Sequence, residues 1–211
     1  DTDRSRGLGD VYKRQGVDPT GAPVDVIIAV WPWDAYLGEE ALQNGIKVGV
    51  SSWRQRSFNA IPPAVKSSAS YMNSILAKKE ATLHGYAEAI MLNEEGRVCE
   101  GTGENIFVVR NGILSTPPLS DGLLEGITRD TILTLATDMD IPAIEESLTR
   151  SDLYVADEAF MTGSAAELTP INSIDDRVIG KRGPITEQLQ KRYFDVAYGK
   201  VPEYEDWITR F

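Results

Sequence analysis

Short runs of β-branched and apolar residues alternate with helix-forming segments along nearly the whole of this 211-residue chain. This interleaving limits the fold more than any other feature, because it argues against both an all-helical and an all-strand architecture. Strands are predicted at "VDVIIAVW", which reads as a buried strand, and at "IKVGVSSW", "YAEAIML", "NIFVVRNGILSTPP", "EAFMTG" and "PINSIDD". Helices are predicted over 66–83, 126–140 and 184–198, and a short helix is predicted to stop at Gly45. The predicted class is therefore α/β or α+β, and the order of the strands stays open.

The clearest local signals are one helix and one hairpin. In the helix over 66–83, Tyr71, Ile75, Leu76 and Lys79 recur at helical spacing, which predicts an amphipathic helix. The dipeptide Asn111-Gly112 between two apolar runs predicts a tight hairpin turn, because both residues tolerate positive φ.

Charge and composition exclude several classes of function. The net charge of −11 argues against binding to nucleic acid or to anionic membranes. No apolar run is long enough to span a bilayer, and the first residues do not resemble a signal peptide. Cys99 is the one cysteine and His84 the one histidine, so an intrachain disulfide is impossible and a zinc site is not expected. We expect a cytoplasmic protein without a metal.

The first fifteen residues, "DTDRSRGLGDVYKRQ", have no periodicity and no apolar face. They resemble translated adapter sequence, and we expect residues 1–15 to be foreign to the protein. A natural disordered tail is the alternative.

The remaining chemistry points to a lysine. There is no Walker motif and no glycine-rich dinucleotide fingerprint. A catalytic triad would depend on His84 alone, and this residue near the end of a polar helical stretch fits a solvated histidine at a helix C-terminus. A lysine amine forms Schiff bases with aldehydes, and pyridoxal phosphate is a common aldehyde cofactor. This cofactor needs a lysine, a carboxylate at its pyridine nitrogen, a partner for its ring oxygen and a cradle for its phosphate.

The chain offers a candidate for each of these needs. Lys66 follows a double proline and precedes small residues that would let a flat ring approach, with Tyr71 five residues further on. Glu100 and Glu104 are both candidates for the pyridine nitrogen. The helix start "EGITRDTI" and the turn "MTGSAAE" are candidates for the phosphate. Each signal alone also fits an ordinary surface lysine, surface acid or helix cap.

Together and in this order, these segments resemble the successive motifs of the class IV aminotransferases, the fold-type IV pyridoxal-phosphate enzymes. The matching segments are "IPPAVKSSASYMNSILAKKEA", "CEGTGENIFVVRNGIL", "LLEGITRDTILTLA" and "DEAFMTGSAAELTPI". The loop "VWPWDAYLGEEAL" adds a feature typical of the branched-chain amino-acid aminotransferases within that class. The resemblance covers about residues 17–200 and implies the fold of the D-amino-acid aminotransferases.

The resemblance also implies a role for each residue around the cofactor ring. Lys66 would form the Schiff base with pyridoxal 5'-phosphate and move the proton between the substrate carbon and the cofactor carbon. Tyr71 would bind the ring oxygen, and Glu100 would meet the pyridine nitrogen. Leu124 would lie against the ring.

Four further residues are implied at the phosphate and the substrate carboxylate. Ile127 and Thr128 would bind the phosphate at the start of a helix. Ser164 would also contact the phosphate, and the backbone of Ser164 and Ala165 would help to hold the substrate carboxylate.

Members of this family are longer than this chain and begin with a small domain, so the resemblance implies an N-terminally truncated protein. Trp33 and Tyr36 would lie in the interdomain loop, near the substrate side chain. The absent part carries further groups for the phosphate and the substrate, so we expect the chain alone to bind the cofactor weakly. The implied organisation, after the tail, is a remnant of the small domain (16–32), an interdomain loop (33–44) and the large cofactor-binding domain (45–211).

The implied activity is the transfer of the amino group of L-leucine, L-isoleucine or L-valine to 2-oxoglutarate, and the full-length protein would be a homodimer or larger homo-oligomer. A D-amino-acid aminotransferase or an aminodeoxychorismate lyase of the same fold is the first alternative, which the "WPWDAYLG" loop argues against. A non-catalytic small-molecule-binding domain is the second. The choice among leucine, isoleucine and valine stays open.

Overall fold

The computed structural model of the protein describes residues 17–32 and 36–209, and the chain divides into two units, residues 1–33 and 34–211. The described part of the first unit holds one turn, in which the Ala22 N–H donates to the Pro19 carbonyl (2.9 Å), and no helix or strand. The prediction of a buried strand at "VDVIIAVW" is wrong, because its valines and isoleucines (Val24, Val26, Ile27, Ile28 and Val30) are at least 86% exposed. A strand needs a paired backbone and a covered face, and residues 24–30 are not part of the described sheet and are exposed. The predicted foreign tail, residues 1–15, lies outside the described residues.

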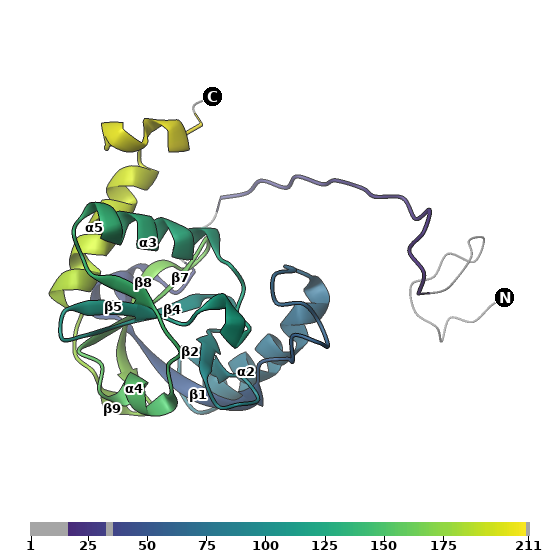
Figure 1. Ribbon diagram of the computed structural model, residues 1–211, viewed down its shortest axis with the longest axis horizontal. Coiled ribbons are helices and arrows are strands. Elements are labelled where there is room, and N and C mark those ends of the chain that lie inside the picture. Colours follow the sequence, from purple (N-terminus) through teal and green to yellow (C-terminus); the bar gives the residue numbers. More distant parts are fainter. Residues whose placement is uncertain (1–16, 33–35, 210–211) are drawn as a thin grey trace. The chain divides into compact units, whose positions relative to one another are not determined.

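The second unit mixes strands and helices, as predicted (Figure 1). Its strands are β1 (Ile46–Arg54), β2 (Glu88–Leu92), β3 (Val98–Glu100), β4 (Asn105–Arg110), β5 (Ile113–Thr116), β6 (Ala143–Glu145), β7 (Glu158–Gly163), β8 (Glu167–Ile174) and β9 (Arg177–Val178). Its α-helices are α1 (Glu39–Asn44), α2 (Tyr71–Leu83), α3 (Ile127–Asp138), α4 (Arg150–Tyr154) and α5 (Pro184–Ala197). Short 3₁₀ helices lie at Ser68–Ser70, Leu119–Asp121 and Pro202–Trp207.

The strands form one mixed sheet in the order β3-β2-β1-β8-β7-β4-β5-β6, and β9 pairs with β8. β1 runs parallel to both β2 and β8, whereas β7 runs antiparallel to both β4 and β8. The pairs β1 with β8 and β4 with β7 join segments that are far apart in the sequence, which is why periodicity alone left the strand order open.

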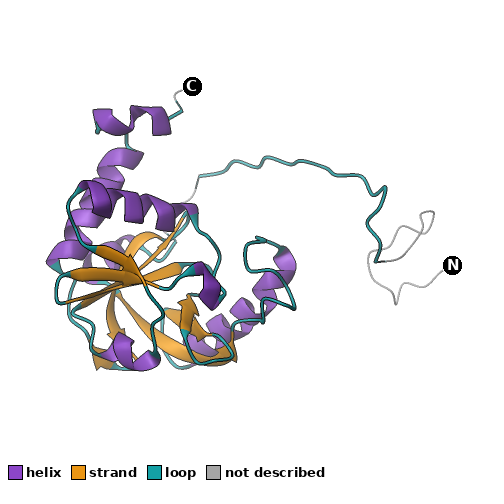
Figure 2. Ribbon diagram, viewed as in Figure 1, coloured by secondary structure: helices purple, strands orange, loops and turns teal. Residues whose placement is uncertain are grey.

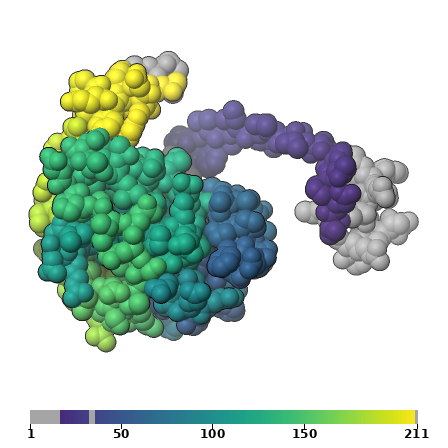
Figure 3. Space-filling model, viewed as in Figure 1, coloured from purple at the N-terminus to yellow at the C-terminus, as the bar shows by residue number. Residues whose placement is uncertain are grey.

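The sheet is covered on both faces (Figure 2). Along β4, Ile106 faces the same cluster as Leu153 of α4, whereas Phe107 faces the cluster built with α3 and α5. Phe107 stacks on Phe160 of the neighbouring strand with ring centroids 5.0 Å apart. In the space-filling view, the blue-to-green part of the chain forms one continuous packed surface (Figure 3).

Helix α2 packs on β1 and β2, but through a different face from the one that carries its largest apolar residues. Ser74, Ala77 and Ala81 are its buried residues, while Ile75 is 62% exposed. The face indicated by Ile75 is therefore not the packed one. Small side chains let the helix axis approach the strands closely. In α2 this close approach decides which face is buried, and the size of the apolar side chains does not.

Most of the other local predictions are confirmed. Asn111 and Gly112 have positive φ (51° and 78°) at the tip of the hairpin between β4 and β5. Gly45 ends α1, and Gly126 stands at the entrance of α3. Among the described strands and α-helices, β3, β6, β9 and α4 were not predicted. None of the described helices is both long and apolar enough to cross a lipid bilayer.

Candidate active site

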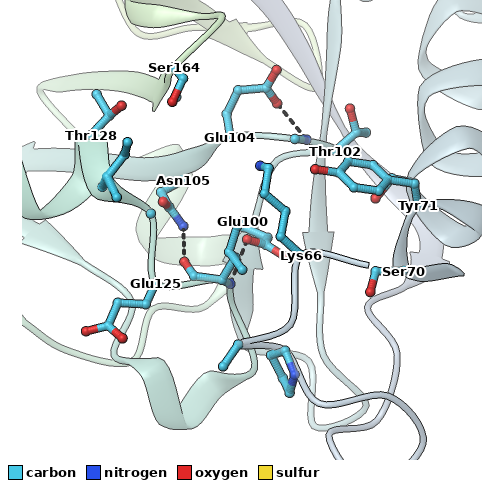
Figure 4. A pocket seen from close by; sticks show the side chains of 18 of the residues that line it. Lys66, Ser70, Tyr71, Glu100, Thr102, Glu104, Asn105, Glu125, Thr128 and Ser164 are labelled. Carbon is cyan, nitrogen blue, oxygen red and sulfur yellow. Dashed lines mark hydrogen bonds between the residues drawn. The ribbon is translucent and has the colours of Figure 1, made fainter. Parts of the chain in front are cut away.

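Seven side chains that the sequence singles out line one cavity of about 370 Å³ in the second unit. They come from different elements: a loop after β1, the start of α2, the end of β3, the loop and first turn of α3, and the turn after β7. The seven are Lys66, Tyr71, Glu100, Leu124, Ile127, Thr128 and Ser164. Figure 4 shows the Lys66 amine pointing into the middle of the cavity, with Tyr71 on one side and Thr128 and Ser164 on the other.

Lys66 reaches the cavity from the connection between β1 and α2. Its Nζ atom lies 5.9 Å from the centroid of the Tyr71 ring. Ser70, one of the small residues that follow it, is buried and lines the same cavity. The amine therefore faces a phenol and a carboxylate across an open space, instead of pointing away from the fold.

The Glu100 carboxyl is held by hydrogen bonds on both of its oxygens. Oε1 accepts from the Gln55 side-chain amide, and Oε2 accepts from the Leu124 N–H (3.0 Å). Burial raises the pKa of Glu100 to about 7, against the opposing effects of these two donors and of the positive charges of Arg56 and Lys66. An acid with a pKa near neutrality can hold or release a proton at working pH.

Glu104, the other carboxylate considered for the ring nitrogen, also lines the cavity. It is buried, and its Oε2 accepts from the Gly103 N–H (3.0 Å). Burial and the nearby negative charge of Glu88 raise the pKa of Glu104 to about 7. Glu88 is in turn fully buried and is paired with Lys78 (2.6 Å). The cavity therefore contains two buried acids, of which Glu100 feels the charge of Lys66.

The first turn of α3 supplies a positively polarised edge of the cavity. The N–H groups of Ile127 and Thr128 are in the first turn, where the helix itself offers them no acceptor. Gly126 lets Asn105 approach, because a Cβ at this position would lie 2.1 Å from Asn105 Oδ1. Asn105 Nδ2 donates to the Leu124 carbonyl (2.9 Å) and so holds the loop that carries Leu124. The edge suits an anion.

Two buried polar atoms in the cavity wall have no partner within the described residues. They are Oγ1 of Thr162, whose side chain is fully buried, and Nε of Arg56. Buried polar groups are usually satisfied, so these two indicate space for a polar ligand. The part of the chain that the structure describes contains no group of acidic, histidine and cysteine side chains placed to hold a metal ion.

The residues expected at the substrate are less completely placed. Trp33 lies outside the described residues. Tyr36 is 43% exposed, lies with its ring centroid 5.7 Å from Lys78 Nζ, and is not part of the cavity wall. Ala165 follows the cavity residue Ser164 but does not itself line the cavity.

Sequence reasoning missed Gln55, Arg56, Asn105 and Thr162, which all lie around this cavity or its carboxylate. Asn105 ends the run "GTGEN" that drew attention to the two acids. The other three stand in strands or at strand ends, where no spacing rule connects them to Lys66.

A family model described as amino-transferase class IV matches residues 4–174. The chain belongs to the class IV aminotransferase family. The chain is also similar to solved structures: the branched-chain aminotransferase of Thermoproteus uzoniensis with norvaline matches it with a TM-score of 0.82 and 49% sequence identity. The branched-chain amino acid aminotransferase of Thermobaculum terrenum, solved in its PLP form, has a TM-score of 0.80 and 42% identity. The predicted fold class is confirmed.

The chain spans only part of these relatives. It matches the branched-chain-amino-acid aminotransferase of Pseudomonas aeruginosa with 50% identity over 196 residues, which is 92% of this chain and 64% of the relative. The alignment with the Thermoproteus structure covers 86% of this chain and 59% of that chain, and the alignment with the Thermobaculum structure covers 84% and 58%.

Proposed function

We propose that this chain is the cofactor-binding part of a pyridoxal-phosphate-dependent branched-chain amino-acid aminotransferase. The observation that carries the proposal is the convergence of an amine, a phenol, a double-acceptor carboxylate and a helix N-terminus on one cavity. The relatives with 42–50% identity that bear this activity in their names support it.

The cavity residues fit the chemistry of pyridoxal phosphate. A volume of about 370 Å³ is in the range of small-molecule sites. The first turn of α3, with the hydroxyls of Thr128 and Ser164, would hold the phosphate, and the unpartnered hydroxyl of Thr162 would add a donor at the same wall. When bound, the cofactor supplies an aldehyde carbon and a ring that accepts negative charge from the substrate carbon.

Each remaining residue then has a definite task. Lys66 would bind the cofactor aldehyde, and its Nζ atom would then move the substrate proton. Glu100 would accept a hydrogen bond from the ring nitrogen and keep that nitrogen protonated. Tyr71 would hydrogen-bond the ring oxygen, and Leu124 would support the ring.

The proposed substrates are L-leucine, L-isoleucine or L-valine as amino donors and 2-oxoglutarate as acceptor. We also propose that residues 45–211 are the cofactor-binding domain and that 33–44 are an interdomain loop that brings Trp33 and Tyr36 to the substrate side chain. The backbone of Ser164 and Ala165 would help to hold the substrate carboxylate. A cytoplasmic homo-oligomer is part of the same proposal. Sedimentation velocity measures the oligomer, and a purely monomeric protein would contradict this part.

The test of the cofactor proposal is covalent and does not depend on turnover. The full chain is mixed with pyridoxal phosphate, the visible absorbance band of lysine-bound cofactor is recorded, and the adduct is reduced with borohydride. Peptide mass spectrometry should then find the added mass on Lys66. Lys66→Ala should lose the band, whereas Lys79→Ala, which removes an exposed lysine of α2, should keep it.

Three outcomes would contradict the proposal. An unlabelled Lys66, or an equal band in the Lys66→Ala variant, would remove the assigned lysine. Turnover of D-alanine in place of L-leucine would favour the D-amino-acid aminotransferases instead.

A further inference from the structure

We propose that Gln55 is the positioning residue for Glu100: it fixes the direction of this carboxylate and keeps it an acceptor. Gln55 directly follows β1, is 2% exposed, and has its backbone N–H bound to the Leu92 carbonyl (2.8 Å). Its side chain therefore starts from a fixed point next to the cavity wall.

The orientation of the Gln55 amide is determined by its surroundings. Its Oε1 accepts from the backbone N–H of Arg56 (3.2 Å) and from Arg56 Nη1 (3.3 Å). Two donors on one atom identify that atom as the oxygen, so the amide nitrogen must be the atom that faces Glu100. Gln55 Nε2 accordingly donates to Glu100 Oε1.

Arg56 supports this arrangement from behind. Its Nη1 is shared between Gln55 Oε1 and the Ser70 carbonyl (3.2 Å), which ties the turn after β1 to the start of α2. The guanidinium charge reaches Glu100 through the polarised Gln55 amide, and charge-assisted hydrogen bonds of this kind are stronger than neutral ones.

Glu100 then has one oxygen bound by Gln55 and the other bound by the Leu124 N–H. A carboxylate accepts about four hydrogen bonds, so lone pairs remain for a donor in the cavity. A protonated Glu100 would have to turn its O–H away from both N–H donors. The arrangement therefore favours the charged acceptor, which is the form that a protonated ring nitrogen requires. This last step rests on the proposed function.

The other charges near Glu100 do not replace this role. The charges of Lys66 and Arg56 favour the charged Glu100 carboxylate, while the charge of Glu100 contributes to the raised pKa of Glu104. The Cys99 thiol beside Glu100 is buried, donates to the Asp121 carbonyl, and has a pKa raised mainly by burial. Of all these groups, only Gln55 and the Leu124 N–H donate hydrogen bonds to the carboxylate.

The experiment is a ¹³C NMR titration of the Glu100 carboxyl in the full, cofactor-free chain, with the resonance assigned by its loss in Glu100→Gln. Gln55→Leu keeps the shape but removes the donor, and it should raise the measured Glu100 pKa by about one pH unit. Gln55→Glu places an acceptor against the carboxylate and should raise the Glu100 pKa further. If Gln55→Leu fails to fold, Gln55→Glu provides the test instead.

The matched control is Gln190→Leu. Gln190 is an equally buried glutamine whose amide donates to the Leu42 and Leu168 carbonyls (2.8 and 2.9 Å), away from Glu100. This variant should leave the Glu100 titration unchanged. An unchanged Glu100 midpoint in both Gln55 variants, or an equal shift in Gln190→Leu, would overturn the assignment.

Adding pyridoxal phosphate separates this inference from the proposed function. If the unaltered chain fails to attach the cofactor at Lys66, the proposed function fails while the titration still decides the role of Gln55. If the cofactor attaches, Gln55→Leu should retain the lysine-bound band and weaken cofactor affinity about tenfold, with Gln190→Leu unchanged. Equal affinity in Gln55→Leu and in the unaltered chain would overturn the link between Gln55 and the ring nitrogen.

Discussion

Replacing Glu100 by Gln should remove a large part of the pH dependence of folding stability in the cofactor-free protein. Burial raises the pKa of Glu100 from 4.5 to about 7. The folded chain therefore holds this proton over a pH range in which the unfolded chain has already released it. Because the folded state binds more protons there, the free energy of unfolding falls as pH rises through this range.

The size of the effect follows from the pKa difference. The interval between 4.5 and about 7 is about 2.5 pH units, and each unit corresponds to about 1.4 kcal/mol, so the loss is about 3 kcal/mol. The loss in the free energy of unfolding should be absent below pH 4.5, should grow between pH 4.5 and 7, and should stay constant above pH 7. Glu100→Gln cannot titrate and should lack it.

The measurement is urea unfolding of both proteins at several pH values between 4.5 and 8.5. The Gln amide cannot accept from both Gln55 and the Leu124 N–H, so the variant carries a stability offset. This offset is the same at every pH. The free energy of unfolding of one protein is therefore subtracted from that of the other at each pH, and the test is whether this difference changes with pH. Gln190→Leu, which removes no titratable group, should differ from the unaltered chain by a constant.

The reasoning would be refuted if the free energies of unfolding of the unaltered chain and of Glu100→Gln differed by the same amount, within about 0.5 kcal/mol, from pH 4.5 to 8. It would also be refuted if the unaltered chain became more stable relative to Glu100→Gln as pH rises, since that would mean that folding lowers the pKa of Glu100. Bound pyridoxal phosphate should reduce the pH-dependent loss, because its protonated ring nitrogen would pair with the charged carboxylate.

Three further perturbations test other parts of the site and the core. Gly126→Ala should cost about 1–3 kcal/mol in urea unfolding, because the new methyl group would lie 2.1 Å from Asn105 Oδ1; an equally stable variant would contradict this close approach. Thr128→Val should weaken binding of pyridoxal phosphate about tenfold in a fluorescence titration while the exposed Thr137→Val on the same helix does not, and equal affinities would remove Thr128 from the phosphate site. Phe160→Ala should cost about 3–5 kcal/mol, because this fully buried ring stacks on its neighbour, and a loss below about 1 kcal/mol would argue against that packing.

Local chemistry was readable from the residues wherever neighbours along the chain make the structure. The hairpin at Asn111-Gly112 depends on two residues that accept positive φ, and the end of α1 depends on Gly45. The entrance of α3 at Gly126, whose backbone is extended (φ −75°, ψ 134°), was readable from the helical pattern that follows it. The ordered motifs that contain Lys66 and Glu100 were sufficient to indicate the family.

Periodicity failed where long-range packing decides which residues are covered. The run at 24–31 has the composition of a buried strand, yet its side chains are exposed, because burial depends on a partner and not on composition. In α2 the sheet selects the small side chains Ser74, Ala77 and Ala81, and leaves Ile75 outside. The pattern of apolar residues in a helix does not state how closely the helix will approach the sheet that covers it.

The cavity is the clearest product of tertiary structure. Lys66, Glu100 and Thr128 are ordinary residues within their own segments of the sequence. They line the same cavity only because folding brings these three segments together. The residue types and their order were present in the sequence. The hydrogen bonds of Gln55 to Glu100, the raised pKa of that acid and the unpartnered hydroxyl of Thr162 were not, because each arises from groups that meet only when distant strands pair and exclude water.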